Sequence, residues 1–274
     1  MKNTTDGSIA LPLLARLLRH CSFPHKLGIM DRIFAGSLSD HGIAWVETAC
    51  GETWKLDLTN STHRWMVYGD YEGGGFLNWV RKTIPTTGVV VDSGANIGQM
   101  AVYFAQVVRE GKVFAFEPGA KQVAWLAECV ERNSHLPIEI VHAGLSDNQR
   151  NSFLLNDGNA HTHGSWCKVS EAGGEPIQLI TLDAFIAKNG IRHVSLWKMD
   201  MEGHEPAALR GASGALQAGA IGALYVELSG GSGAWITEFL GKLGYLPFHP
   251  DGRGDIHPAR HWDAYENVLF VRSH

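Results

Sequence analysis

From residue 88 onward, segments with the apolar pattern of a strand alternate with segments that have the apolar spacing of a helix. Short runs rich in β-branched and aromatic residues predict buried strands at 88–92, 112–118, 138–146, 194–202 and 223–229. The segments between and after them have helical spacing at 97–110, 120–133, 182–190 and 205–219. Strands that alternate with helices predict a parallel sheet with helices on both faces. We therefore expect an α/β fold with a doubly wound, mostly parallel sheet.

Two parts of this region depart from the alternation. Extended segments at 150–156 and 175–182 flank a polar loop, which is longer than a compact domain usually keeps and is a candidate lid over a bound acceptor. Near the C-terminus, a helix at 233–244 leads to apolar segments at 245–250 and 267–273, with no helix between them. These last two segments predict an antiparallel pair that completes the sheet.

The first 85 residues have a different pattern. Strands are predicted at 42–49 and 53–58, around a turn at Cys50–Glu52. The segment 63–84 reads as a loop followed by an amphipathic helix, whose apolar face is Phe76, Leu77, Val80 and Ile84. We therefore divide the chain into an N-terminal extension at 1–85, which contacts substrate or a second subunit, and a ligand-binding domain at 86–274.

A leucine-rich helix is predicted within residues 9–23. Leu13, Leu14, Leu17 and Leu18 share one face, which we expect to pack on the body of the protein or on the second subunit of a homodimer. A helix on a membrane surface is the alternative. The segment is too short and too charged for a membrane span, and it is a poor signal peptide.

Composition limits the class of protein further. The chain has 274 residues, 45% hydrophobic and 19% charged, with a formal net charge of −5, as is ordinary for a globular protein. This charge does not suggest binding to nucleic acid or to anionic lipid by the chain as a whole, although a local basic patch stays open. The four cysteines form no C-x-x-C pair, so we expect no thiolate zinc site and a reducing, cytoplasmic location.

The turn after the first strand of the domain, in VVVDSGANIG at 89–98, indicates the ligand. A dinucleotide fold places G-x-G-x-x-G here, whereas this chain has Gly94, Asn96 and Gly98. Asp92, at the end of the strand, would repel a pyrophosphate and attract an ammonium group. Glu117 ends the next strand, where a carboxylate accepts ribose hydroxyls. These features favour S-adenosylmethionine as the cofactor.

A second polar stretch, KMDMEGHEP at 198–206, follows a later strand. Asp200 and Glu202 are two residues apart, so they share a face for as long as the strand continues. Ligands bind beyond the carboxyl ends of strands in doubly wound sheets. Asp92, Glu117, Asp200 and Glu227 all fall at such ends, so we expect them to meet at one edge of the sheet.

These motifs together resemble the FkbM family of S-adenosylmethionine-dependent methyltransferases. The matching residues are VVVDSGANIG at 89–98, FEP at 116–118, TLDAF at 181–185, KMDMEGHE at 198–205 and YVEL at 225–228. The resemblance implies a seven-stranded sheet whose last strand is antiparallel, and methylation of hydroxyl groups on sugars or natural products. Only this resemblance assigns Glu72 to the cofactor site. The cofactor-binding residues we expect are Glu72, Asp92, Gly94, Asn96, Gly98, Glu117, Leu145 and Asp200.

The catalytic candidates are Asp200, Glu202 and His204. A hydroxyl acceptor needs a base, and we expect Asp200 nearest the methyl group, with Glu202 favoured over His204 as base. Alternatively, Glu202 and Glu205 only cap the next helix or bind Arg210. A divalent metal on Asp200 with Glu202 or Glu227 is conceivable but not favoured, and His161 and His163 are expected to be solvated.

Two other functions stay open at the level of sequence. A nicotinamide-dependent oxidoreductase is disfavoured by the missing middle glycine and by Asp92. A catalytically silent partner subunit is disfavoured by the retained acids, which are costly to bury without partners. The acceptor is expected to be a small molecule or a glycan and not a nucleic acid.

Overall fold

The computed structural model describes residues 8–21, 23–69, 74–156, 167–228, 231–261 and 266–273. Its helices are α1 (Leu13–Leu18), α2 (Lys26–Ser39), α3 (Ser61–Tyr68), α4 (Gly75–Thr83), α5 (Ala101–Val107), α6 (Ala120–Arg132), α7 (Leu182–Lys188), α8 (Glu205–Arg210), α9 (Ser213–Gln217) and α10 (Gly233–Lys242). Its strands are β1 (Ile43–Glu47), β2 (Thr53–Asp57), β3 (Val89–Ser93), β4 (Lys112–Phe116), β5 (Ile138–Val141), β6 (Gly144–Leu145), β7 (Arg150–Asn156), β8 (Cys167–Ser170), β9 (Glu175–Ile180), β10 (Leu196–Met199), β11 (Ala223–Leu228), β12 (Tyr245–Pro250), β13 (Ile256–Pro258) and β14 (Glu266–Arg272).

A central sheet, in the strand order β13-β12-β14-β11-β10-β3-β4-β5, positions the rest of the molecule. Four neighbouring pairs are parallel, as the alternation of strands and helices predicts: β11–β10, β10–β3, β3–β4 and β4–β5. Val90 and Val91 are fully buried, because a strand covered by helices on both faces has no side exposed to water. The doubly wound α/β fold is thereby confirmed.

The C-terminal end of this sheet also follows the prediction. β14 lies between β11 and β12 and runs antiparallel to both, which confirms the antiparallel finishing pair. The short strand β13 adds to β12 at the edge. The described sheet therefore has eight strands where the family resemblance implies seven.

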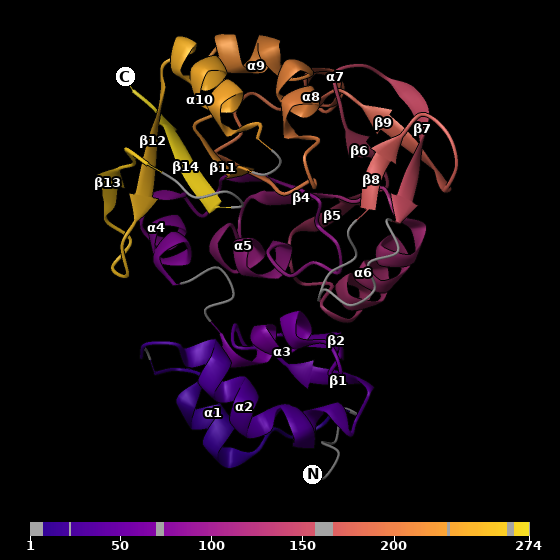
Figure 1. Ribbon diagram of the computed structural model, residues 1–274, viewed down its shortest axis with the longest axis vertical. Coiled ribbons are helices and arrows are strands. Elements are labelled where there is room, and N and C mark those ends of the chain that lie inside the picture. Colours follow the sequence, from indigo (N-terminus) through magenta and orange to yellow (C-terminus); the bar gives the residue numbers. More distant parts are fainter. Residues whose placement is uncertain are drawn as a thin grey trace.

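Helices cover the two faces of the sheet as two separate layers (Figure 1). One face carries α7, α8, α9 and α10, with a core that includes Trp197, Leu209, Ile236 and Phe270. The other carries α4, α5 and α6, and its core continues into the N-terminal elements. The predicted apolar face of α4 is confirmed, since Phe76, Leu77, Val80 and Ile84 are all buried.

A separate four-stranded sheet, in the order β6-β9-β7-β8, accounts for the extended segments around the long loop. β7 and β9 pair antiparallel, and β8 pairs with β7. The expected single strand at 138–146 is wrong, because the chain leaves the central sheet after Val141 and its last part, β6, pairs with β9. The candidate lid is the loop expected at 157–174. Its residues Cys167–Ser170 form β8, so the expectation of a loop is wrong there, and residues 157–166, with His161 and His163, lie outside the described residues.

Three further boundaries differ from those expected. The helix expected at 97–110 covers only Ala101–Val107, and the strand expected at 194–202 ends at Met199. The helix expected at 205–219 is two helices, α8 and α9. They break near Gly211, where a Cβ atom would lie 1.9 Å from the backbone oxygen of Ser146. The close approach to the segment after β6, which local periodicity does not report, requires a glycine at this break.

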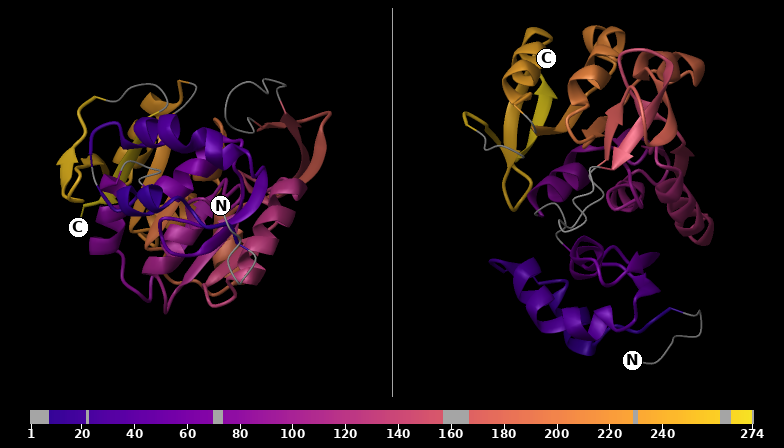
Figure 2. Two further views of the ribbon diagram at one scale, coloured as in Figure 1. Left: turned by 90° about the horizontal axis from the view of Figure 1, so that it is seen from below. Right: turned by 45° about the vertical axis from the view of Figure 1, so that its right-hand side comes forward.

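The N-terminal elements form a layer below the helices α4, α5 and α6 (Figure 2). β1 and β2 pair antiparallel, as expected. Two tryptophan side chains form hydrogen bonds between this layer and the main domain. The Trp54 indole donates to the carbonyl of Ile97 at 2.7 Å, and the Trp125 indole donates to the carbonyl of Lys55 at 2.7 Å. The loop expected at the start of 63–84 is wrong, because these residues continue the helix α3.

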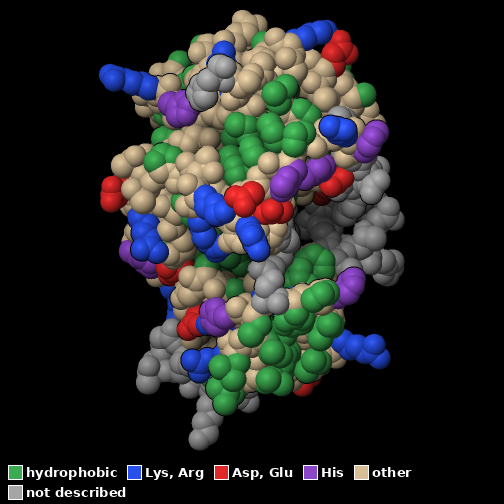
Figure 3. Space-filling model, turned by 90° about the vertical axis from the view of Figure 1, so that its left-hand side faces the viewer, with side chains coloured by type: hydrophobic (Ala, Val, Ile, Leu, Met, Phe, Trp, Pro, Cys, Tyr) green, Lys and Arg blue, Asp and Glu red, His purple; other side chains and the backbone are tan. Residues whose placement is uncertain are grey.

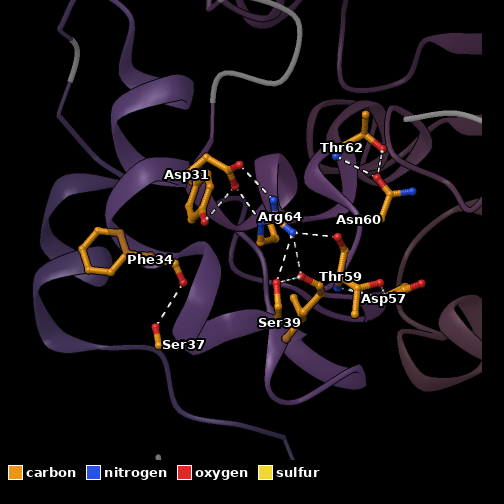
Figure 4. Close-up of polar contacts among 11 residues, drawn as sticks. Asp31, Phe34, Ser37, Ser39, Asp57, Thr59, Asn60, Thr62 and Arg64 are labelled. Carbon is orange, nitrogen blue, oxygen red and sulfur yellow. Dashed lines mark hydrogen bonds and ion pairs between the residues drawn. The ribbon is translucent and has the colours of Figure 1, made fainter. Parts of the chain in front are cut away.

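α3 is held by one buried arginine (Figure 4). Asn60 caps the helix by accepting from the backbone of Thr62 at 2.9 Å. The guanidinium of Arg64 donates to both carboxylate oxygens of Asp31 on α2, at 2.6 and 2.9 Å, and to the carbonyl of Leu58 at 2.8 Å. Arg64 therefore links α2, α3 and the end of β2.

α1 does not pack in the way its leucines suggest. Leu13, Leu14 and Leu17 are 70%, 53% and 60% exposed, while Ala15 is buried. The expectation that the leucine face packs on the body is therefore wrong for these three side chains, and Figure 3 shows an apolar surface over this end of the molecule. Among the described residues, no helix is long and apolar enough to cross a membrane. The four cysteines are free thiols.

Candidate functional site

The glycine turn after β3 is built from backbone contacts. The amides of Gly94 and Ala95 both donate to the carbonyl of Phe116 at the end of β4, each at 3.0 Å. Gly94, Asn96 and Gly98 have φ values of 75°, 51° and 88°, so the turn needs residues that tolerate the left-handed region. Asn96 meets this need, as the sequence suggests for a turn with Asn in the middle position.

The two glycines serve different purposes. A Cβ atom on Gly94 would lie 1.9 Å from the backbone oxygen of Asp200, so this glycine allows β3 and the end of β10 to approach each other. A Cβ on Gly98 would instead lie 2.6 Å from Leu126 and 2.8 Å from Trp54. Gly98 therefore permits close packing of the turn on α6 and β2.

A pocket opens at the carboxyl ends of β3, β4 and β10, which is where ligands bind in doubly wound sheets. The structure brings eight of the predicted residues to this pocket: Asp92, Gly94, Asn96, Glu117, Leu145, Asp200, Glu202 and His204. It does not bring Gly98, which faces the core. Glu72 lies outside the described residues.

Glu117 is fixed at the rear of the pocket by two backbone amides. Its Oε2 accepts from Asn96 at 2.8 Å, and its Oε1 accepts from Gly119 at 2.9 Å. Burial nevertheless raises the pKa of Glu117 to about 7, against the lowering effect of these hydrogen bonds. Each carboxylate oxygen has a second lone pair, so Glu117 has the geometry to accept a pair of neighbouring hydroxyl groups.

Asp92 and Asp200 lie on either side of a buried lysine. Lys198 Nζ lies 3.1 Å from Asp200 Oδ2 and 3.7 Å from Asp92 Oδ1. Asp92 is fully buried, and neither of its oxygens has a hydrogen-bond partner among the described residues. Burial raises the pKa of Asp92, and the charge of Asp200 adds to this effect while Lys198 opposes it.

Glu202 is held in an unusual backbone conformation directly after Asp200. Its φ of 54° is rare for a residue that has a Cβ. The strand ends at Met199, so the predicted shared strand face of Asp200 and Glu202 is wrong, although the turn still carries both side chains to the pocket. Burial, followed by the charges of Asp200 and Glu205, raises the pKa of Glu202 to about 7. A carboxylate with this pKa is suited to proton transfer near neutral pH.

Two more glutamates lie near this acidic turn. Glu205 is fully buried, and its Oε1 accepts from the backbone of Met201 at 2.7 Å, so it stabilises the turn before α8. Burial and the neighbouring acids, Asp200 first, raise the pKa of Glu227 to about 8. Arg210 pairs with Asp147 at 3.7 Å and not with either Glu202 or Glu205. No group of three metal-ligating side chains is found within the part of the chain that the structure describes.

His204 lies at the start of α8, lines the pocket, and contacts the segment after β6. Its Nε2 is 3.0 Å from the hydroxyl of Ser146, directly after β6. Burial lowers the pKa of His204, and the charge of Arg150 adds to this effect. His204 is therefore neutral at pH 7 and is able to accept a proton.

Sequence reasoning missed two kinds of pocket residue. Lys198 is the first, and its signal is a lysine inside an otherwise apolar strand, where a buried charge needs partners. The second is a set from outside the central sheet and the helices that cover it: Thr62 on α3, Leu154 on β7, and Cys167 and Val169 on β8. No sequence signal connects these residues, because they come from three elements that only the tertiary fold brings together.

The comparisons with known proteins bear on this geometry. The methyltransferase FkbM domain matches residues 92–247, which contain most of the pocket. No curated protein matches the chain. Among solved structures, an rRNA methylase from Streptococcus thermophilus is 11% identical over 72% of this chain and 93% of that chain, with a TM-score of 0.44.

Two further structures are similar at the same level. The methyltransferase domain of METTL16 is 12% identical, and the match covers 99% of this chain and 85% of that chain with a TM-score of 0.46. TrmK of M. capricolum, solved with S-adenosylhomocysteine, is 13% identical, with 71% and 65% coverage and a TM-score of 0.39. The acceptor of the present chain does not follow from likeness at this level.

Proposed function

This chain belongs to the FkbM methyltransferase family and is a methyltransferase that uses S-adenosylmethionine, and we propose that its acceptor is a hydroxyl group on a sugar or another natural product. The observation that carries the proposal is Glu202, a pocket-lining carboxylate whose pKa is about 7. A hydroxyl is a poor nucleophile until its proton is removed, and a base with this pKa is suited to remove it.

The proposed cofactor contacts rest on the burial and the hydrogen-bond partners of each pocket side chain. Asp92, buried without a hydrogen-bond partner among the described residues, accepts from the cationic amino group, and Glu117 accepts from the ribose hydroxyls. Leu145 packs against the adenine, and Gly94 and Asn96 shape the turn around the ligand. Asp200, which is paired with Lys198, lies nearest the transferred methyl group.

The proposed reaction is an in-line displacement. S-adenosylmethionine supplies the methyl group and a sulfonium that leaves as the thioether of S-adenosylhomocysteine. As the acceptor oxygen forms its bond to carbon, Glu202 takes the hydroxyl proton, with His204 as the second candidate for this role. The walls from α3 and the β7–β8 hairpin align the acceptor, and alignment of this kind contributes several kcal/mol to a bimolecular transfer.

The cofactor contacts are tested by calorimetric titration. We expect the wild-type protein to bind S-adenosylmethionine and not NAD⁺, and we expect Asp92→Asn and Glu117→Gln each to weaken binding about tenfold or more, as for lost hydrogen bonds to charged groups. Glu139→Gln is the matched control, because Glu139 lies on the neighbouring strand β5 and pairs with Lys112 on the surface. Unchanged affinity in both site variants would refute the proposed contacts.

The acceptor is tested separately, by release of S-adenosylhomocysteine with a panel of sugars, phenols and amines. We expect turnover with hydroxyl compounds, and we expect Glu202→Gln to lower it by about a hundredfold while cofactor affinity stays the same. His204→Gln is the comparison for the second candidate base. Turnover with amines alone, or full turnover in Glu202→Gln, would overturn the hydroxyl proposal while leaving the cofactor site intact.

A further inference from the structure

The described residues place an exposed apolar surface on the first two helices. Five large apolar side chains on these helices are well exposed: Leu13 at 70%, Leu14 at 53% and Leu17 at 60% on α1, and Ile29 at 43% and Ile33 at 55% on α2. We call these five residues the α1–α2 face. Both helices keep their inner sides in the core through Ala15, Met30, Phe34 and Leu38, so the exposed side chains belong to folded elements. A contiguous apolar surface of this kind marks an interaction site (Figure 3).

The exposed charged side chains within α1 and α2 are both positive, and the exposed acid Glu47 is paired with Arg19 in the connection between the two helices. Arg16 and Arg32 are exposed on the same two helices, and His20 and His25 are exposed in the connection between them. The helices carry one acid, Asp31, and its carboxylate is neutralised by Arg64 at 2.6 Å. The next exposed acid along the chain is Asp40, at the C-terminal cap of α2. The formal net charge of the whole chain is −5, so this positive region is local.

The pattern of charge selects between two occupants. A second copy of the chain would bring two exposed arginines per copy to the contact, against one exposed acid per copy, Asp40 at the C-terminal cap of α2. A membrane that carries anionic headgroups offers phosphates to the arginines and an acyl region to the leucines and isoleucines. Helices with an apolar face and a basic rim lie in the interface of such membranes.

We propose that the α1–α2 face binds the surface of a membrane with anionic headgroups. Leu13, Leu14 and Leu17 enter the boundary between headgroups and acyl chains, together with Ile29 and Ile33, while Arg16 and Arg32 contact phosphates. This contact does not involve the pocket, and it is independent of the proposed methyl transfer. It places the enzyme on the membrane without a spanning segment.

The test is flotation of the full-length protein with vesicles. We expect it to float with vesicles of phosphatidylcholine mixed with phosphatidylglycerol, and not with phosphatidylcholine alone. The variant Leu14→Gln/Leu17→Gln/Ile33→Gln loses apolar area, so its vesicle affinity falls about tenfold or more. Arg16→Gln/Arg32→Gln also weakens binding, about fivefold for each arginine, and removes much of the dependence on salt.

The matched control is Leu246→Gln, because Leu246 is an apolar side chain of similar exposure, 49%, on β12. Its affinity stays at the wild-type value. All substituted side chains are exposed, so equal urea midpoints verify that the variants fold. Failure of the wild type to bind anionic vesicles, or full binding by the triple variant, would overturn the proposal. A dimer in ultracentrifugation that the triple variant abolishes would assign the face to a second copy instead.

Discussion

Lys198 balances charge at the centre of the site. The lysine is 4% exposed and lies between Asp92, which is fully buried, and Asp200. Cross-strand pairing explains the arrangement, since Lys198 on β10 stands beside Asp92 on β3. A buried carboxylate without hydrogen-bond partners remains charged only if a cation is close. Lys198 therefore opposes the rise that burial causes in the pKa of Asp92.

Replacement of Lys198 by methionine removes this cation with little change of volume. We expect Lys198→Met to lower the free energy of unfolding by about 3–5 kcal/mol, because it leaves a buried charge without its partner. Urea unfolding followed by circular dichroism at pH 7.5 measures the change. S-adenosylmethionine binding is expected to fall as well, since loss of the lysine disfavours the charged form of Asp92.

The double variant Lys198→Met/Asp92→Asn checks the cause. With the acid removed too, we expect much of the lost stability to return. Lys242→Met serves as the control, because Lys242 forms an exposed pair with Glu238 and its loss leaves the urea midpoint unchanged. A single variant as stable as the wild type would mean that Asp92 is not held by Lys198.

At the scale of elements, the N-terminal layer depends on α3. Arg64 on α3 donates to Asp31 and to the carbonyls of Leu58 and Thr59, so one side chain satisfies groups from α2 and from the turn after β2. The hydrogen bond with Asp31 is the main cause of the raised pKa of Arg64. Thr62, at the first turn of α3, lines the pocket. The position of α3 therefore connects the N-terminal layer with the site.

We expect Arg64→Met to lower the free energy of unfolding by about 3–5 kcal/mol, because Asp31 and two backbone carbonyls lose a buried donor. Urea unfolding at neutral pH measures this loss. Arg81→Met is the matched control, since Arg81 is exposed and its guanidinium contacts only Asn78 in its own helix among the hydrogen bonds of the described residues. If the two variants lost equal stability, Arg64 would not be the link between α2 and α3.

At the scale of the whole molecule, the site gathers acids at a cost in stability. Glu117 and Glu202 have pKa values of about 7, and Glu227 has a pKa of about 8, against an ordinary value of 4.5. The folded chain therefore holds more protons than the unfolded chain between these values and the ordinary one. Natural binding sites commonly carry such destabilising charges, which a ligand then compensates.

The sign of the pH dependence follows from these directions. Raised acid pKa values make the free energy of unfolding fall as pH rises from the ordinary value of 4.5 to about 7 for Glu117 and Glu202, and to about 8 for Glu227, by about 1.4 kcal/mol per pH unit for each proton retained. Solvent reduces the effect at the half-exposed Glu202 and Glu227. Below pH 6.5 the lowered pKa of His63, about 4, opposes the trend, because the unfolded chain then binds more protons.

Urea unfolding at half-unit steps of pH checks this prediction. We expect Glu227→Gln to flatten the upper part of the profile, and S-adenosylmethionine to stabilise the protein more at pH 8 than at pH 6.5. A free energy of unfolding that rises or stays level between pH 6.5 and pH 8 would contradict the raised pKa values of the three glutamates.

The sequence by itself determined the strands of the central sheet and the edge of the sheet at which their acidic residues lie. The runs around Val90 and Phe114 are apolar because strands covered on both faces must be, and this pattern predicts a parallel sheet. Parallel strands end at the same edge, so the positions of Asp92, Glu117 and Asp200 in the sequence already placed them together. The turn with Asn96 excluded a dinucleotide fingerprint for a steric reason that is local.

Only the tertiary structure decided which groups are partners and where elements stop. β10 ends at Met199 and α8 at Arg210, both earlier than the local pattern predicts, because periodicity reports only neighbours along the chain. Gly98 faces the core, against Leu126 and Trp54, which are both distant from it in sequence. The pairing of Lys198 with two acids, the wall from Thr62 and the exposed leucines of α1 each depend on contacts between residues far apart in sequence, whose burial no local pattern records.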